Sequence, residues 1–133
     1  MDNTRRALET HLSSCLNPIE IDYDNVTYNP TNGVPYLSID MLRGHTDDVS
    51  LAFDDKTIEN GIFQLSLYYP TANGSADAED KAIELVSHYK RGTTIPKGNR
   101  EVRILKMPTF KNFDIIDDRF VIIVSIVYKS HSV

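Results

Sequence analysis

Apolar and polar residues alternate most regularly between Gly61 and Pro70. Phe63, Leu65, Leu67 and Tyr69 fall on one side of an extended chain, and Ile62, Gln64, Ser66 and Tyr68 fall on the other. Burial of the first set would stabilise the fold by roughly 1.5–3 kcal/mol per residue. The segment therefore predicts a long strand with one face in the core.

Two other segments have helical periodicity. Between Thr4 and Leu16 the apolar residues Leu8, Leu12 and Cys15 form one stripe, and the following Asn17-Pro18 pair stops a helix. The second segment starts after Ser75, which is expected to cap it, and runs to about Tyr89. Its acidic first turn and basic last turn both oppose the helix dipole, and Gly92 is expected at its C′ position.

Weaker alternation predicts further strands. They are expected at 19–24, 34–42, 49–53, 102–106 and 120–128. The turn-rich segment Asn29–Gly33 separates the first two, which are therefore expected to form a hairpin. The last one is apolar on both faces, as in a central strand. The stretches 43–48, 93–99 and 107–116 lack a clear pattern and are expected to be loops or irregular.

The element order is therefore α-β-β-β-β-α-β-β. A chain of 133 residues fits one domain, here 1–133. Strands outnumber helices and short turns join several of them. We expect an α+β fold, with a mainly antiparallel sheet of four to six strands and two helices packed on one face.

Composition excludes few function classes. No apolar run approaches the ~20 residues of a membrane span, and the polar start Met1–Arg6 lacks the apolar segment of a secretion signal. We therefore expect a cytoplasmic site of synthesis and no membrane partner. Cys15 is the only cysteine, so an internal disulfide is impossible.

The net charge of −5 is unevenly distributed. From Glu20 to Glu59 nine acidic and two basic residues give −7, and from His88 to Lys111 seven basic and one acidic residue give +6. Three interpretations remain open: a solvated rim, oppositely charged surfaces that meet between copies of the protein, and contact with nucleic acid.

Candidate chemistry is sparse. His11 and Cys15 have the i, i+4 spacing of two metal ligands, but Cys15 belongs to the apolar stripe. His45–Asp48 and Asp117-Asp118 are explained by solvated turns. The sequence has no glycine-rich phosphate loop, no Gly-x-Ser-x-Gly and no His-Glu-x-x-His. We therefore predict no enzyme activity, no catalytic or metal site and no cofactor.

Two segments together resemble a known family. They are 24–42, with Asn25-Val-Thr-Tyr-Asn-Pro30 followed by Pro35-Tyr-Leu37, and 61–92, with Gly61-Ile-Phe-Gln64 leading through Pro70 and Gly74 into a helix that ends near Gly92. Their order and spacing after an N-terminal helix are similar to those of the tail terminator proteins of long-tailed bacteriophages. The individual motifs are loose, because they are turns and strand faces and not reactive residues.

The resemblance implies a structural virion protein that forms a hexameric ring at the head-proximal end of the tail. Such a ring stops polymerisation of the tail tube protein and provides a docking surface for head-completion proteins of the neck, while DNA passes through its lumen. Assembly in the host cytoplasm, location in the virion tail and the absence of catalysis and cofactors are implied as well.

The family offers no residue motif for the contacts, so the interface residues are predicted from charge and aromatic character. They are Arg43, Asp47, Asp48, Arg100, Arg103, Phe110 and Phe113. We expect the acidic 43–60 region of one copy to approach the basic 90–106 region of its neighbour.

Two other functions remain as alternatives. The first is a head–tail joining protein of the neck, which has the same assembly class but binds on the head side. The second is a small ligand-binding or enzymatic domain, which would require His11, His45 and His88 to converge in a pocket.

Overall fold

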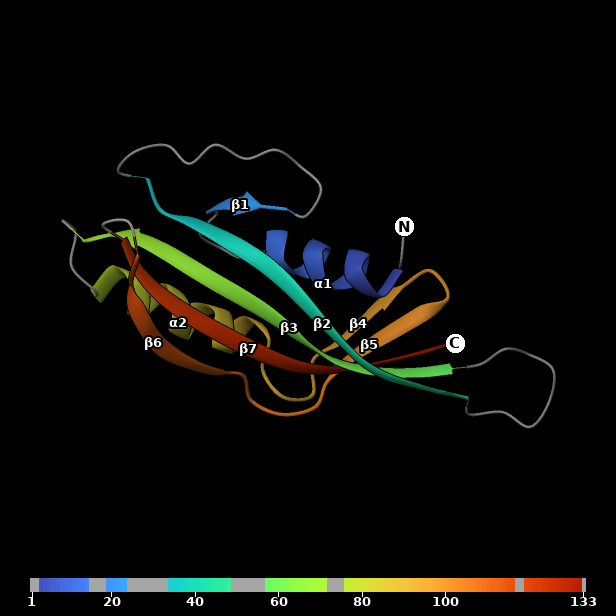
Figure 1. Cartoon of the computed structure of the whole chain (residues 1–133). Helices are drawn as coiled ribbons and strands as arrows, with labels where there is room; N and C mark the ends of the chain where they lie inside the picture. The colour runs from blue at the N-terminus through green and yellow to red at the C-terminus, as the bar shows by residue number, and fades with distance from the viewer. Residues whose placement is uncertain are drawn as a thin grey trace.

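A computed structural model of the chain describes residues 3–14, 19–23, 34–48, 57–71, 76–116 and 119–132. Within these ranges the chain forms two helices and a seven-stranded sheet (Figure 1). The elements in chain order are α1 (Asn3–Ser13), β1 (Glu20–Asp22), β2 (Tyr36–Asp48), β3 (Thr57–Pro70), α2 (Ala76–His88), β4 (Thr94–Lys97), β5 (Arg100–Ile104), β6 (Thr109–Ile116) and β7 (Arg119–Ser132).

The sheet is organised around β7. Along one side β7 pairs with β3, from Ile58↔His131 to Pro70↔Arg119. Along the other side it pairs first with β6 and then with β5. The full order is β1-β2-β3-β7-β5-β4, with β6 beside β7. β7 contains residues 120–128, so the prediction that this segment is a central strand is confirmed.

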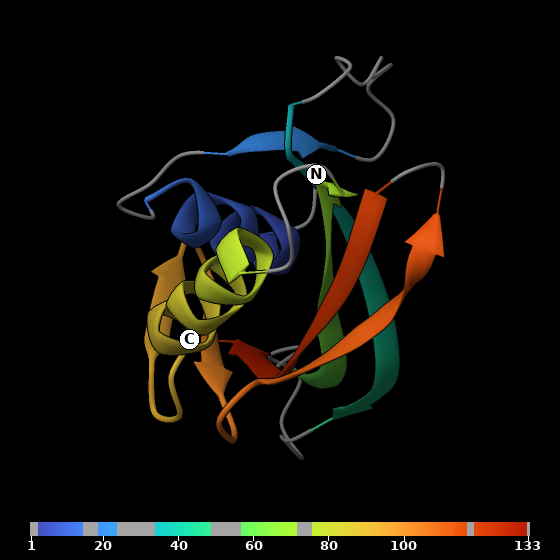
Figure 2. The ribbon, with the colours of Figure 1, turned by 90° about the vertical axis from the view of Figure 1, so that its left-hand side faces the viewer.

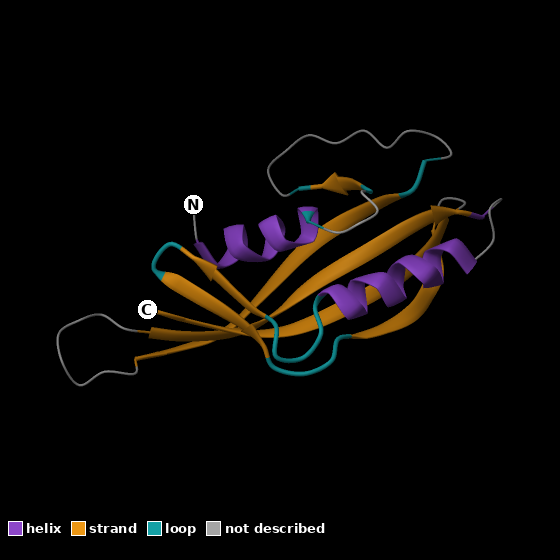
Figure 3. Ribbon diagram, turned by 180° about the vertical axis from the view of Figure 1, so that it is seen from behind, coloured by secondary structure: helices purple, strands orange, loops and turns teal. Residues whose placement is uncertain are grey.

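The sheet curls around the helices. Figure 2 shows the strands bent into an open trough, and both helices lie on its concave side. In Figure 3 the two helices lie in front of different parts of the sheet. The α1 helix lies against β4 and β5, and α2 lies against β3, β6 and β7. The α+β class is therefore right, but the prediction of a simple helix layer on one sheet face is imprecise.

The core occupies the space between the helices and the concave face. Most apolar positions predicted from periodicity are buried there, which confirms the long strand and both helices. The buried residues include Leu8 and Leu12 of α1, Phe63, Leu65, Leu67 and Tyr69 of β3, Ala78, Ala82 and Leu85 of α2, and Ile122, Val124, Ile126 and Tyr128 of β7. Cys15 and Leu16 lie outside the described residues.

The predicted hairpin of 19–24 with 34–42 is wrong. β1 runs parallel to β2, with Glu20↔Tyr36, Ile21↔Leu37 and Asp22↔Ser38 as partners. The antiparallel partner of β2 is instead β3. In this arrangement Ile21 packs against the core beside the buried Leu37. The sheet is therefore mixed, because of this pairing, and the mainly antiparallel description holds for the remaining strands.

Three segments predicted as loops or irregular are strands. Residues 43–48 continue β2, 94–97 form β4 and 109–116 form β6. Their alternation is hidden by polar residues and by Pro96 and Pro108, and their backbone hydrogen bonds come from partners distant in sequence. β4 and β6 raise the count to seven, above the predicted four to six. The predicted strand 49–53 lies outside the described residues.

Two glycines occupy positions that suit a residue without a side chain, one through its backbone angle and one through a close contact. Gly92 has a positive φ of 88°, as expected, but α2 ends at His88, so Gly92 lies in the following turn and not at C′. Gly61 lies opposite Tyr128 in the register of β3 and β7. A Cβ at Gly61 would lie 2.6 Å from the Tyr128 hydroxyl and 2.7 Å from the Leu42 carbonyl oxygen. The absence of a side chain at 61 therefore lets the Tyr128 ring cross β3.

Gly61→Ala should lower the free energy of unfolding by about 1–3 kcal/mol, because the new methyl group must displace both the tyrosine and the backbone of β2. Urea unfolding followed by circular dichroism measures the change. Asn60→Ala, at the next position of β3, is the matched control and should change stability much less. Equal stability of Gly61→Ala and wild type would contradict the described packing.

Candidate functional site

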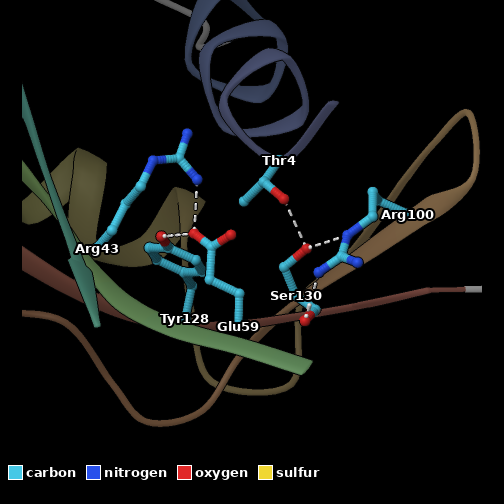
Figure 4. Close-up of polar contacts among 6 residues, drawn as sticks. All are labelled: Thr4, Arg43, Glu59, Arg100, Tyr128 and Ser130. Carbon is cyan, nitrogen blue, oxygen red and sulfur yellow. Dashed lines mark hydrogen bonds and ion pairs between the residues drawn. The ribbon is translucent and has the colours of Figure 1, made fainter. Parts of the chain in front are cut away.

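The predicted interface residue Arg100 belongs to a polar cluster inside the fold (Figure 4). Its Nε donates to the Ser130 Oγ at 3.0 Å, and its Nη2 donates to the Ser130 carbonyl oxygen at 3.0 Å. The same Ser130 Oγ lies 2.7 Å from the Thr4 Oγ1. Thr4 and Ser130 are fully buried. Arg100 thus links β5 and β7 to the first turn of α1.

The predicted interface residue Arg43 also has an internal partner. Its Nη1 lies 2.7 Å from the Glu59 Oε1, and the Tyr128 hydroxyl donates to the same oxygen at 2.8 Å (Figure 4). The Glu59 side chain is 13% exposed, whereas that of Arg43 is 40% exposed. The carboxylate therefore joins β2, β3 and β7 at the end of the trough near the N-terminus of α1.

Arg103 differs from these two arginines. Its side chain is 55% exposed, and its Nη2 lies 3.5 Å from the Glu101 Oε1 on the same strand. The same Glu101 oxygen lies 3.7 Å from the His131 Nε2. An ion pair this open to water restrains the side chain weakly. Of the three predicted arginines, Arg103 has the most exposed side chain, whereas Arg43 is less exposed and Arg100 is partly buried.

Of the other predicted interface residues, Phe110 is the one whose side chain the structure describes. Phe110 is 38% exposed, and its register partner on β7 is the buried Val124, so it lies on the helix side of β6. Asp47 and Asp48 are in β2, and Phe113 is in β6, but their side chains lie outside the described part of the chain. The structure does not bring Phe110 together with any of the arginines.

Two of the three histidines proposed for a pocket do meet. The rings of His11 and His88 stack with centroids 4.0 Å apart, and Tyr89 contacts both edge-on. The Nε2 of each histidine lies within hydrogen-bond distance of the other's carbonyl oxygen. The Tyr89 hydroxyl donates to the Leu8 carbonyl oxygen at 2.7 Å. The cluster therefore joins the C-terminal ends of α1 and α2.

These contacts define the chemistry of the histidine pair. Burial lowers the pKa of His11, and the nearby His88 lowers it further, although the hydrogen bond to the His88 carbonyl oxygen acts in the opposite direction. The imidazoles use ring nitrogens to bond backbone carbonyls. Among the residues that the structure describes, no group of three His, Cys, Asp or Glu side chains lies close enough to hold a metal ion. The pair is explained as a structural contact between helix ends.

Sequence reasoning missed the exposed face of the sheet. Leu42, Ile62 and Val127 are register partners on neighbouring strands, and they lie on the face opposite the helices. The backbone N–H of Leu105 donates to the Val127 carbonyl oxygen at 3.1 Å, which continues the row past β7. Leu42 is 51% exposed and Leu105 40%. The signal is absent from any single strand, because it depends on the register of several.

A second feature of this face is aromatic. The rings of Tyr36 and Tyr68 stack at a centroid distance of 4.6 Å, and the Arg119 guanidinium lies 5.0 Å from the Tyr36 ring centroid. Burial raises the pKa of Tyr68, with smaller contributions from Tyr36 and nearby carboxylates. Arg119 also donates to the Val34 carbonyl oxygen at 2.6 Å. This stack lies at the end of the sheet where β2 begins.

Comparison with known proteins decides the family. The family model described as "Phage tail terminator protein" matches residues 3–128. The chain belongs to the phage tail terminator family. Its membership confirms the resemblance seen in the sequence and makes it a structural protein of a phage tail. The family is non-enzymatic, in agreement with the sparse chemistry described above.

Other comparisons add the fold alone. A solved structure of a protein without a functional name matches with a TM-score of 0.77 and 22% identity, over 97% of this chain and 94% of that one. At this identity the likeness shows a shared fold. No curated protein matches the chain. Neither helix of the described part has the length and apolar character that crossing a membrane requires.

In this terminator family member, Arg100→Met should be costly, because it removes charge-assisted hydrogen bonds to Ser130 in a buried cluster. We expect a loss of about 1–3 kcal/mol in the free energy of unfolding. Arg103→Met, an equal change three residues along β5, is the matched control and should remain within about 0.5 kcal/mol of wild type. Equal losses in urea unfolding would refute the distinct roles of the two arginines.

The histidine contact should make stability depend on pH. Because the folded protein holds the pKa of His11 below its ordinary value of 6.5, the unfolded chain binds more protons in the window below pH 6.5. The free energy of unfolding should therefore rise with pH through this window and level off above it.

His11→Gln should flatten this dependence, whereas Thr10→Gln, on the exposed side of α1, should retain it. Urea unfolding at several pH values between 5 and 8 measures the slopes. A His11→Gln slope as steep as that of wild type would show that His11 is not its source.

Proposed function

We propose that the protein forms a ring that caps the head-proximal end of the tail tube. The ring stops addition of tube protein and presents a docking surface to the head-completion proteins of the neck. The observation that carries this proposal is the match of nearly the whole chain to the terminator family. The proposed partners are further copies of this chain, the tail tube protein and a neck protein, with DNA passing through the lumen.

The distribution of polar contacts and exposed apolar side chains supports a role in assembly. The two described histidines that stack, His11 and His88, bond to backbone carbonyls at the helix ends. By contrast, Leu42 and Leu105 are exposed in one row with Ile62 and Val127 across the convex face of the sheet. A contiguous exposed apolar row of this kind is typical of contacts with other proteins. A cap needs such surfaces and needs no reacting group.

The exposure of the predicted arginines supports one choice for the basic side of the proposed contact between copies. Arg103 is the most exposed of the three arginines, and its 3.5 Å ion pair with Glu101 is open to water, whereas Arg43 and Arg100 make shorter contacts within the subunit. In the acidic region 43–60, Glu59 is held by Arg43 and Tyr128, and residues 49–56 lie outside the described part of the chain. We therefore assign the basic side of the proposed ring contact to the neighbourhood of Arg103.

Deletion of the gene from the phage that encodes it should yield tails of uncontrolled length, because nothing would stop addition of tube protein. Electron microscopy of the particles measures the tail lengths. Complementation with the wild-type gene should restore a single length. Complete tails of normal length that are detached from heads would contradict termination and would instead indicate a joining protein of the neck.

A further inference from the structure

The apolar row on the convex side of the sheet is not accounted for by the packing of the described chain. It crosses β2, β3 and β7 through Leu42, Ile62 and Val127 and reaches Leu105 after β5. Met107, two residues beyond, is 50% exposed. No helix of the described chain covers this side, since both helices lie in the concave trough (Figure 2).

The row has a basic border on one side. There the next row contains the register partners Arg103 and Lys129, whereas the next row on the other side contains the exposed Asp40 with Gln64 and Ser125. The Arg103 side chain is 55% exposed. Lys106, which follows Leu105, is exposed as well. A partner for this surface should therefore combine an exposed apolar side chain with acidic neighbours, because opposite charges around an apolar contact favour the correct partner and register.

The outward side of α2 has this combination. Ile83 is 54% exposed in the middle of the helix. Asp77, Asp80 and Ser87 are exposed on the same side, while Ala78, Ala82 and Leu85 are buried against the sheet. Lys81, the lysine within α2, is 6% exposed and pairs with Glu84 at 3.3 Å. The exposed stripe of α2 is therefore acidic around one apolar residue.

The two surfaces agree in size. Neighbouring strands are about 4.8 Å apart, so a row across four of them spans about 14 Å. A helix rises about 1.5 Å per residue, so the stripe from Asp77 to Ser87 spans about 15 Å. They also lie on different sides of the molecule. α2 lies on the concave side of the sheet (Figure 3), and the burial of Ala78, Ala82 and Leu85 turns the exposed stripe away from the sheet.

We propose that the exposed stripe of α2 in one copy packs on the apolar row of the next copy, with Ile83 beside Val127 and Leu105 and with Asp77 and Asp80 facing Arg103 and Lys129. The contact is heterologous, since each copy contributes a different surface, and such contacts propagate into rings when the rotation closes. This inference rests on the proposed ring and adds its two contacting surfaces.

Cysteine cross-linking in assembled tails tests the contact. The variant carries Ile83→Cys and Leu105→Cys in a Cys15→Ser background, and purified tails are treated with a short bis-maleimide. Both substituted positions are exposed, so the fold should be retained. We expect a ladder of covalent dimers and larger oligomers on denaturing gels, because each copy would be linked to two neighbours.

The matched controls carry one of the two cysteines alone in the same background. Neither single variant should give covalent oligomers. Dimers from Leu105→Cys alone would mean that two convex faces meet and would overturn the proposal. Absence of the ladder from the double variant, or its cross-linking to the tube protein alone, would also overturn it.

The gene deletion separates this inference from the proposed function. If deletion leaves tail length uncontrolled and the double variant terminates tails normally without a ladder, the protein is a terminator that uses other surfaces. If deletion leaves tail length normal, the proposed function itself fails, and with it the inference that rests on it.

Discussion

The pairing of β7 on both of its sides is the constraint on which the rest of the structure depends. β3 follows β7 almost from end to end, while β6 and β5 share the opposite side in succession. A strand bonded in this way leaves no free backbone groups to water along most of its length, which explains why both of its faces tolerate apolar residues. The long paired strands twist, and the twist produces the trough in which the helices lie.

Polar contacts then fix the helices and the strand ends within this frame. Ser130 near the end of β7 holds both Thr4 of α1 and Arg100 of β5, and Tyr128 reaches across Gly61 to Glu59. Such buried contacts must be satisfied internally, so they remove their charges from the set available to partners. The charges available on the surface therefore depend partly on which arginines bond inside the fold: Arg100 bonds Ser130, whereas the Arg103 side chain is 55% exposed.

Local periodicity was sufficient for the helices and for the two longest strands, since each buries one regular stripe or face. It failed for β4, β6 and the second half of β2, where polar residues and prolines obscure alternation and the hydrogen-bond partners are distant in sequence. Periodicity also failed to predict how β1 pairs, because the residues of a strand do not indicate whether its neighbour is parallel or antiparallel.

The candidate surfaces were harder still to predict. Arg100 and Arg103 are equivalent in composition and spacing, and only the fold shows that one faces Ser130 and the other faces water. The apolar row of Leu42, Ile62 and Val127 takes one residue from each strand, so no single strand reveals it. The family could be predicted from the order and spacing of turns and elements, because these reflect the whole fold. No individual reactive residue indicated the family.

The proposed contact has a consequence for how a cap would work. A contact between two different surfaces gives every copy the same orientation, so the two rims of a closed ring differ from each other. One rim can then match the tube end while the other lacks the surface that recruits further tube protein. An isologous contact would instead relate neighbouring copies by a twofold axis and present the same surfaces in opposite directions. In the proposed ring, head-to-tail packing of α2 on the sheet would give the two rims the different surfaces that termination needs.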